Sequence, residues 1–248
     1  MATDSLGFKY LNIVEESLNR ILTEEIDKID RAAEFIAKTA IDGGLLHVIG
    51  AGHSAMLGEE LFYRAGGLAF VNPIIDTDIT VGHGALRSTL LEKVVGYAEV
   101  LLKSARVSNR DTVLVVSTSG VNTFPVEAAL KAKELGAKTI AITSISYSSK
   151  LNPRNPWGKR LFEVVDIAID NKVPPGDAVI EIEGLANRVA PLSTITNSFI
   201  AGLLVAYTVQ KLVNKGVEPP IWLSSHLPGA EEHNRKLFDM YMNRIRLL

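Results

Sequence analysis

The chain has 248 residues, of which 47% are hydrophobic and 22% charged, a balance that fills a globular core and excludes a disordered protein. Cysteine is absent, which excludes a disulfide framework, a thiolate zinc site and a cysteine nucleophile. The 26 basic and 28 acidic residues nearly cancel, so the electrostatic footprint of a nucleic-acid-binding protein is missing. The first ten residues do not resemble a signal peptide, and the most apolar stretch (199–207) is too short to cross a bilayer. We therefore expect a soluble, cytoplasmic protein without nucleic-acid or membrane partners.

The first forty residues have the spacing of one long amphipathic helix. Apolar side chains recur at intervals of three and four from Leu11 to Ala40, with charged side chains on the opposite face. Gly43 and Gly44 end the pattern, as glycines at helix C-termini do. We predict a helix over residues 5–42, whose apolar stripe must pack against the rest of the fold or against another subunit.

After this helix, short apolar runs alternate with segments of helical period. Such alternation is typical of a parallel sheet with helices on both faces. The predicted strands are 45–50, 68–71, 112–116, 138–142 and 165–169. The predicted helices are 54–64, 89–105, one with Pro125 in its first turn, 194–211 and one that begins at about Ala230. A loop is predicted over 72–87.

Ligands of open parallel sheets bind outside the carboxyl ends of the strands, and two loops there could bind an anion. The first follows the first strand and reads Gly50-Ala51-Gly52-His53-Ser54 before a helix, whose N-terminus offers free N–H groups. It loosely matches the dinucleotide fingerprint, but Asn72 stands where an acidic residue should hold a ribose, and the absence of Gly-Lys-Ser/Thr excludes a nucleoside-triphosphate loop. A tight turn without a ligand explains this loop equally well.

The second loop, residues 117–123 (Ser-Thr-Ser-Gly-Val-Asn-Thr), supplies four hydroxyls and a helix start without a cation. This donor set suits a phosphate monoester, which accepts many hydrogen bonds and is favoured by the helix dipole. The alternative is that Thr123 or Ser119 merely caps the helix, a role that needs only one hydroxyl. We therefore predict a phosphate-binding loop.

Both loops belong to segments that resemble the SIS (sugar isomerase) phosphosugar-binding domain, namely 46–54 (LHVIGAGHS), 113–144 and 191–194 (PLST). The resemblance covers roughly residues 40–215. Three more segments are similar to single-domain, phosphoheptose-isomerase-like members, namely 59–67, 170–178 and 228–234. The resemblance implies a single SIS domain over residues 1–248, with a C-terminal tail over 216–248. It further implies a three-layer α/β/α sandwich around a five-stranded parallel sheet, working as a homodimer or homotetramer with sites near the subunit interface.

The resemblance also assigns site residues. Ser117, Ser119 and Asn122 fall where family members hold the sugar phosphate, with Asn122 in place of the commoner threonine, and Ser54 and Ser193 fall where the family contacts the sugar. The candidate substrate-binding residues are Gly52, His53, Ser54, Ser117, Thr118, Ser119, Asn122, Thr123, Ser193 and Thr194.

Aldose–ketose isomerisation moves a proton between adjacent carbons through an enediol, which suits a carboxylate base. In phosphoheptose isomerases, a glutamate in a Glu-Leu-x-x-Arg context is the acid/base, and the resemblance places it here at Glu60, which stands in the same context. Compared with that glutamate, Glu60 lies about one helical turn nearer the glycine loop, on nearly the same helix face. It places the partner acid/base at His233, where preceding carboxylates could raise the pKa of the imidazole. Glu60 could equally pair with Arg64 at i, i+4, and His233 could equally be a surface histidine.

The function expected from these residues is that of a sugar-phosphate isomerase. One alternative is a lyase related to N-acetylmuramic acid 6-phosphate etherases, in which Glu92 or Glu99 would replace the glutamate that those enzymes carry directly before a glycine. The other is a non-catalytic sugar-phosphate sensor. The histidines are too scattered to form a recognisable metal site, although some phosphoheptose isomerases bind zinc, and we expect no cofactor. The sequence leaves open which sugar binds and whether the sugar is N-acetylated.

Overall fold

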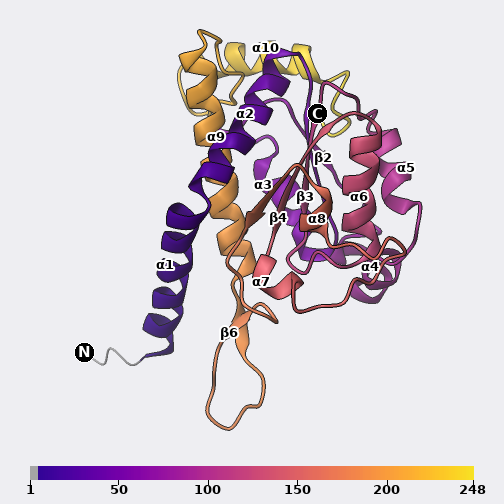
Figure 1. The fold of residues 1–248 in the computed structure, drawn as a ribbon. Coiled ribbons are helices and arrows are strands. Elements are labelled where there is room, and N and C mark those ends of the chain that lie inside the picture. The colour runs from indigo at the N-terminus through magenta and orange to yellow at the C-terminus, as the bar shows by residue number, and fades with distance from the viewer. Residues whose placement is uncertain (1–4) are drawn as a thin grey trace.

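The computed structural model describes residues 5–248 and has the expected architecture, an α/β/α sandwich around a five-stranded parallel sheet (Figure 1). The sheet order is β2-β1-β3-β4-β5, so the direction of strand progression reverses between β1 and β3. In open parallel sheets this reversal marks the usual ligand site. The strands are β1 (Leu46–Gly50), β2 (Val71–Ile74), β3 (Thr112–Val116), β4 (Lys138–Thr143) and β5 (Ile167–Asp170).

The alternation of side chains along β3 explains the two hydrophobic layers. Leu114 and Val116 join the core on the side of α2, α3 and α9, whereas Val113 and Val115 join the core on the opposite side. All four side chains are buried, as expected for the central strand of a sheet that is covered on both faces. The first layer contains α2 (Ile26–Ile41), α3 (Met56–Leu61) and α9 (Ser193–Asn214), and the second contains α5 (Tyr97–Ser104), α6 (Thr123–Glu134) and α8 (Leu161–Val164).

The prediction of one N-terminal helix was wrong, because the chain forms α1 (Leu6–Glu24) and α2 with a break at Glu25. Glu25 is buried, and its carboxylate accepts hydrogen bonds from Lys172 Nζ (2.6 Å) and from the backbone N–H of Asp170 (3.2 Å). These contacts hold Glu25 outside helical geometry, at φ −118° and ψ −4°. As a result α2 runs along α9, whereas α1 extends away from the sheet (Figure 1).

Other boundaries also differ from the prediction. The loop expected over 72–87 contains the end of β2 and the start of the next helix, and the fifth strand, expected over 165–169, is shifted to Ile167–Asp170. The second strand begins at Val71, because Leu68 pairs with Ile221 outside the sheet, and Pro73 is tolerated because β2 is an edge strand. The segment expected as one helix over 89–105 is α4 (Ala85–Leu91) followed by α5. The helix expected over 54–64 begins as the 3₁₀ turn η1 (Gly52–Ala55) and ends with α3 at Leu61.

The break between α4 and α5 is fixed by Glu127 of α6. Gly96 there has φ +92°, and its N–H donates to Oε1 of Glu127 at 2.6 Å. Ala98 N–H donates to the other carboxylate oxygen at 3.0 Å, so the fully buried Glu127 caps α5.

The hairpin of β6 (Ala178–Ile180) and β7 (Val189–Pro191) was not predicted. It projects beyond the body of the molecule, near α1 (Figure 1), and Val179 and Ile180 pack against Tyr10 and Val14. The other elements are η2 (Val81–His83), α7 (Ile145–Ser148) and α10 (Ala230–Tyr241). Within residues 5–248, no helix is both long and apolar enough to span a membrane.

Candidate functional site

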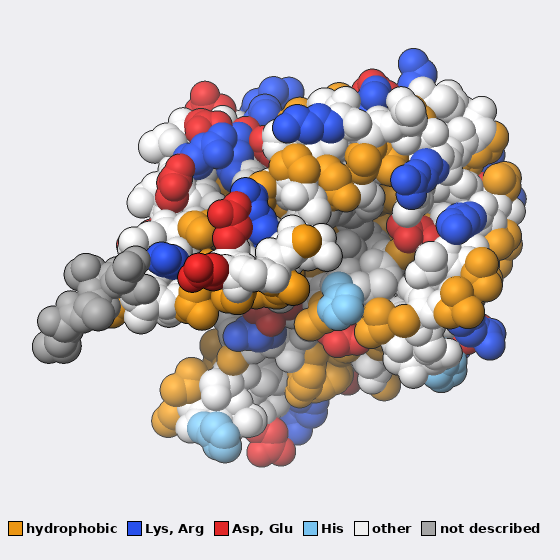
Figure 2. Space-filling model, turned by 90° about the horizontal axis from the view of Figure 1, so that it is seen from below, with side chains coloured by type: hydrophobic (Ala, Val, Ile, Leu, Met, Phe, Trp, Pro, Cys, Tyr) orange, Lys and Arg blue, Asp and Glu red, His pale blue; other side chains and the backbone are white. Residues whose placement is uncertain are grey.

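Two loops leave the sheet side by side at the point where the strand order reverses. Gly50 at the end of β1 is in register with Val116 at the end of β3, so the glycine loop (50–54) and the hydroxyl loop (117–123) start next to each other. The surface at this end of the molecule is hollowed, with a histidine side chain beside the hollow (Figure 2). The structure therefore places the two predicted loops at one edge of the sheet.

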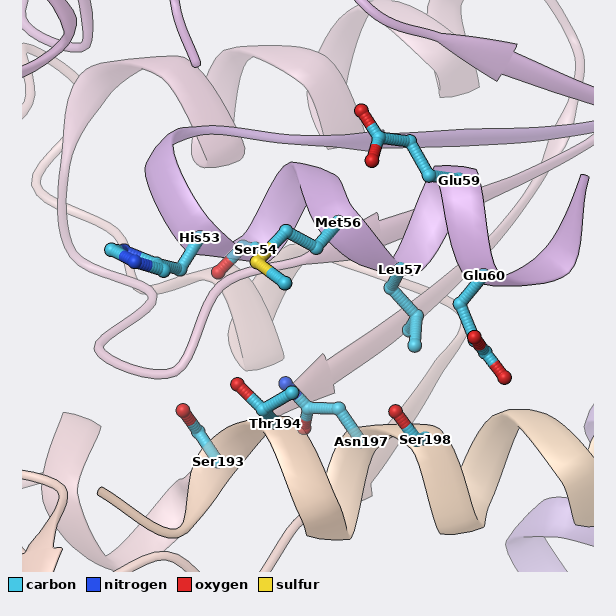
Figure 3. A pocket seen from close by; sticks show the side chains of 10 residues that line it. All are labelled: His53, Ser54, Met56, Leu57, Glu59, Glu60, Ser193, Thr194, Asn197 and Ser198. Atoms are coloured by element: carbon cyan, nitrogen blue, oxygen red, sulfur yellow. The ribbon is translucent and has the colours of Figure 1, made fainter. Parts of the chain in front are cut away.

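A cleft of about 290 Å³ lies between α3 and α9. Figure 3 shows Ser54 and Glu60 on the α3 side and hydroxyl groups on the α9 side directed into this space, whereas Glu59 points away from it. Met56 and Leu57 supply an apolar part of the α3 wall. The lining residues are His53, Ser54, Met56, Leu57, Glu59, Glu60, Ser193, Thr194, Asn197 and Ser198.

The glycine loop needs glycine for steric reasons. A Cβ on Gly50 would lie 2.8 Å from the backbone carbon and oxygen of Ser54, so the chain turns too tightly for any other residue. Gly52 has φ +56°, and its N–H donates to Ile79 O at 2.9 Å. This turn brings His53 and Ser54 into the cleft.

The hydroxyl loop is held by contacts of its own. Ser117 Oγ accepts from Gly120 N–H (3.2 Å), and Thr123 Oγ1 donates to Arg154 O (3.3 Å). The backbone oxygen of Thr118 accepts from Ser144 N–H (3.0 Å). None of Ser117, Thr118, Ser119, Asn122 and Thr123 lines the cleft between α3 and α9.

The N-terminus of α6 carries no side-chain cap, contrary to the capping interpretation of this loop. The N-cap residue is Asn122, whose side chain hydrogen-bonds to Glu92 instead of to an N–H of the helix. Phe124 N–H donates to the backbone oxygen of Glu92 at 3.0 Å. Burial raises the pKa of the Glu92 carboxyl, and the hydrogen bond with Asn122 opposes this rise.

At the start of α9, Asp177 organises the hydroxyl group that faces the cleft. Ser193 Oγ donates to Asp177 Oδ2 (2.6 Å), and the N–H groups of Ser193 (2.8 Å) and Leu192 (3.0 Å) donate to Oδ1. Asp177 thus caps the N-terminus of α9, although it precedes Ser193 by sixteen residues in the sequence. Sequence reasoning missed Asp177, because nothing local relates it to the helix start.

Of the two candidate catalytic residues, only Glu60 belongs to the lining of the cleft. Glu60 lines the cleft and forms an ion pair with Arg64, one turn further along the chain. His233 lies on α10, where Nε2 is 2.9 Å from Ile221 O, and it does not line the cleft. Within the described part of the chain, no three His, Asp or Glu residues cluster as a metal site would require.

Sequence reasoning also missed five residues that line the cleft, namely Met56, Leu57, Glu59, Asn197 and Ser198. A signal for two of them was present. Asn197 and Ser198 follow Ser193 and Thr194 by four residues each, which is the spacing of one helix face. Because the rest of this helix is apolar nearly all round, the short polar face of its first two turns is difficult to recognise in the sequence.

Comparison with known proteins gives one consistent result. A family profile described as "SIS domain" matches residues 9–144. The chain is 38% identical over 240 residues to a UPF0309 protein from Geobacillus thermodenitrificans, covering 97% of this chain and 96% of that protein. A phosphoheptose isomerase from Francisella tularensis superposes with a TM-score of 0.53 at 18% identity, covering 85% of this chain and 99% of that chain. The Vibrio vulnificus NanR protein complexed with ManNAc-6P superposes with a TM-score of 0.52 at 16% identity, covering 99% and 71%.

Proposed function

This chain belongs to the SIS domain family, and from that premise we propose that it is a sugar-phosphate isomerase. The phosphate binds at the hydroxyl loop after β3, and the sugar extends toward the cleft between α3 and α9. The observation that carries this proposal is the register of Gly50 with Val116, which starts both predicted loops side by side at the reversal of strand order. The sugar phosphates named for structural neighbours are consistent with it.

The hydroxyl loop suits a phosphate dianion for two reasons. Ser119 and Asn122 are partly exposed, so their polar side chains are available to an anion, and Gly120 between them turns the loop with a φ of +60°. Below them α6 begins, and its dipole favours negative charge. The hydroxyls and N–H groups of this loop can hold a phosphate without a cation.

We assign the proton transfer to Glu60. Its carboxylate faces the cleft and is oriented by Arg64. In an aldose–ketose interconversion this carboxylate would remove the proton from the carbon next to the carbonyl, giving an enediolate, and would return it to the former carbonyl carbon, while the hydroxyl proton passes from its own oxygen to the former carbonyl oxygen. Ser54 and Ser193 would hold sugar hydroxyls on the two walls of the cleft. No step requires His233 of the same chain.

The test is turnover of hexose, heptose and amino-sugar phosphates by the purified full chain, followed by NMR as aldose–ketose interconversion. We expect Glu60→Gln to abolish turnover with little change in affinity, because the amide keeps the size of the side chain but accepts no proton. We expect Ser117→Ala together with Ser119→Ala to weaken binding at least about tenfold, since each lost hydrogen bond to a charged group contributes about 1.5–3 kcal/mol. Ser104→Ala, an exposed change on α5, is the matched control. Full turnover by Glu60→Gln would disprove the assignment of Glu60.

One observation favours a second candidate function. The carboxyl of Glu92 has a raised pKa because of burial, and it contacts Asn122 at the hydroxyl loop, which is where a lyase acting on an amino-sugar phosphate would need an acid. Glu99 is less suitable, because Lys103 lies 2.6 Å from its carboxylate and lowers its pKa. Lactate release from N-acetylmuramic acid 6-phosphate, lost in Glu92→Gln, would favour this function. Tight binding of a sugar phosphate without any turnover would instead indicate a sensor.

A further inference from the structure

The amide of Asn197 has a fixed orientation in the cleft. Val173 N–H donates to Asn171 Oδ1 at 3.2 Å, so the other end of the Asn171 amide is its NH₂ group. That NH₂ group donates to Asn197 Oδ1 at 2.9 Å. Asn171 is fully buried and Asn197 is 6% exposed, so both amides are held by their surroundings.

Because its oxygen is used by Asn171, Asn197 presents its NH₂ group to the cleft. Figure 3 shows this nitrogen directed toward α3, beside Thr194. Within residues 5–248 the nitrogen has no hydrogen-bond partner. The cleft therefore contains a neutral donor that is already oriented and that lacks an acceptor.

The wall opposite this donor is apolar. Met56 and Leu57 extend from α3 toward α9, and the Met56 side chain remains 45% exposed. The ion pair of Glu60 with Arg64 lies further along the same helix. A ligand group that satisfies both walls carries an acceptor oxygen on one side and a small apolar group on the other.

We propose that this part of the cleft binds the acetamido group of an N-acetylated amino-sugar phosphate. The acetamido oxygen accepts the hydrogen bond from Asn197 Nδ2, and the methyl group packs against Met56 and Leu57. A hydroxyl on the same carbon is shorter than an acetamido group, so it reaches neither the Asn197 donor nor the apolar wall, and an ammonium would face another donor. This inference rests on the proposed function and specifies its substrate class. Asn197 is then the residue that determines specificity, and Asn171 positions it.

The test compares affinities of the full chain, by isothermal titration calorimetry, for the 6-phosphates of N-acetylglucosamine, N-acetylmannosamine, glucose and glucosamine. One added hydrogen bond and one buried methyl group predict that at least one acetylated ligand binds about tenfold or more tightly than the matching hydroxyl and amino sugars. Asn197→Ala should remove this preference and leave the affinity for glucose 6-phosphate within about twofold. Met56→Ser should reduce the preference in the same way without altering the Asn171–Asn197 pair.

The matched control is Asn214→Ala, an exposed change at the other end of α9 that should keep the full preference. Thermal unfolding of each variant shows whether it is folded. If glucose 6-phosphate binds as tightly as both acetylated sugars, or if Asn197→Ala weakens all ligands equally, the acetamido inference is wrong while the proposed function stands. If no sugar phosphate binds at all, the proposed function fails and the inference fails with it.

Discussion

Replacing Lys172 by methionine should destabilise the fold strongly, because it leaves buried carboxylates without their cation. The ammonium of Lys172 lies 2.6 Å from Glu25, 3.0 Å from Glu24 and 3.2 Å from Asp170. The side chains of Lys172 and Glu25 are only 5% and 4% exposed, so water cannot replace the lost partner. Removing one member of a buried ion pair typically costs about 3–5 kcal/mol. Lys28, at 2.8 Å from Glu25, still compensates part of the charge, so we expect about 3 kcal/mol.

The assay is urea unfolding followed by circular dichroism at one fixed protein concentration, because association would add to the apparent stability. The control is Lys38→Met, which breaks an ion pair whose lysine side chain is 71% exposed and should cost less than about 1 kcal/mol. The double variant Glu25→Gln with Lys172→Met should be less destabilised than the sum of the two single changes, because it removes both charges. A Lys172→Met variant within about 1 kcal/mol of the wild type would refute the reasoning.

Two further predictions concern Asp111 and Gly120. Burial alone would raise the pKa of Asp111, but the His47 contact and hydrogen bonds from Leu45 and Ser108 lower it to about 2, below its ordinary value of 3.8. The carboxylate therefore stabilises the fold above about pH 4 and loses this effect as the pH falls toward 2. In urea unfolding, Asp111→Asn should lower the free energy of unfolding by about 2 kcal/mol at pH 7 and by progressively less below pH 4. A difference between variant and wild type that stays constant with pH would contradict this. Gly120→Ala should cost more than about 2 kcal/mol in thermal unfolding, since a Cβ at φ +60° would lie 2.8 Å from Thr143 Oγ1. Gly216→Ala, at φ +70° with nothing within 4 Å of the new Cβ, should cost only about 1 kcal/mol, and equal losses would show that the contact does not matter.

The sheet and its loops could be predicted because their signals are local. The run Thr112–Val116 is mostly apolar and rich in β-branched residues, and the structure places a fully buried strand over the same five residues. Glycines and hydroxyls directly after a strand indicate a binding loop for similarly local reasons, because the turn must be tight and the helix start must be polar. Both loops therefore lie at the predicted edge of the sheet.

The break at Glu25 could not be predicted, because its cause lies 147 residues away at Lys172. Helical period continues through Glu25, and a glutamate within an amphipathic helix ordinarily faces solvent. The same limit applies to the cleft. Asn197 belongs to a helix that is apolar nearly all round, and only the contact with Asn171, 26 residues earlier, shows which of its amide atoms faces a ligand.

These distant contacts meet in one short segment, which runs from Asp170 at the end of β5 to Asp177 just before β6. Asp170 and Lys172 hold Glu25, Asn171 orients Asn197, and Asp177 caps α9 through Ser193. The backbone makes this possible because Lys172 and Asp177 adopt φ of +58° and +67°, which turns successive side chains in different directions. Part of the same segment thus breaks the first helix while the rest orients two residues of the cleft, so a change that strains its backbone should alter stability and ligand affinity together. A change confined to the exposed hairpin tip, such as Asn187→Ala, should alter neither.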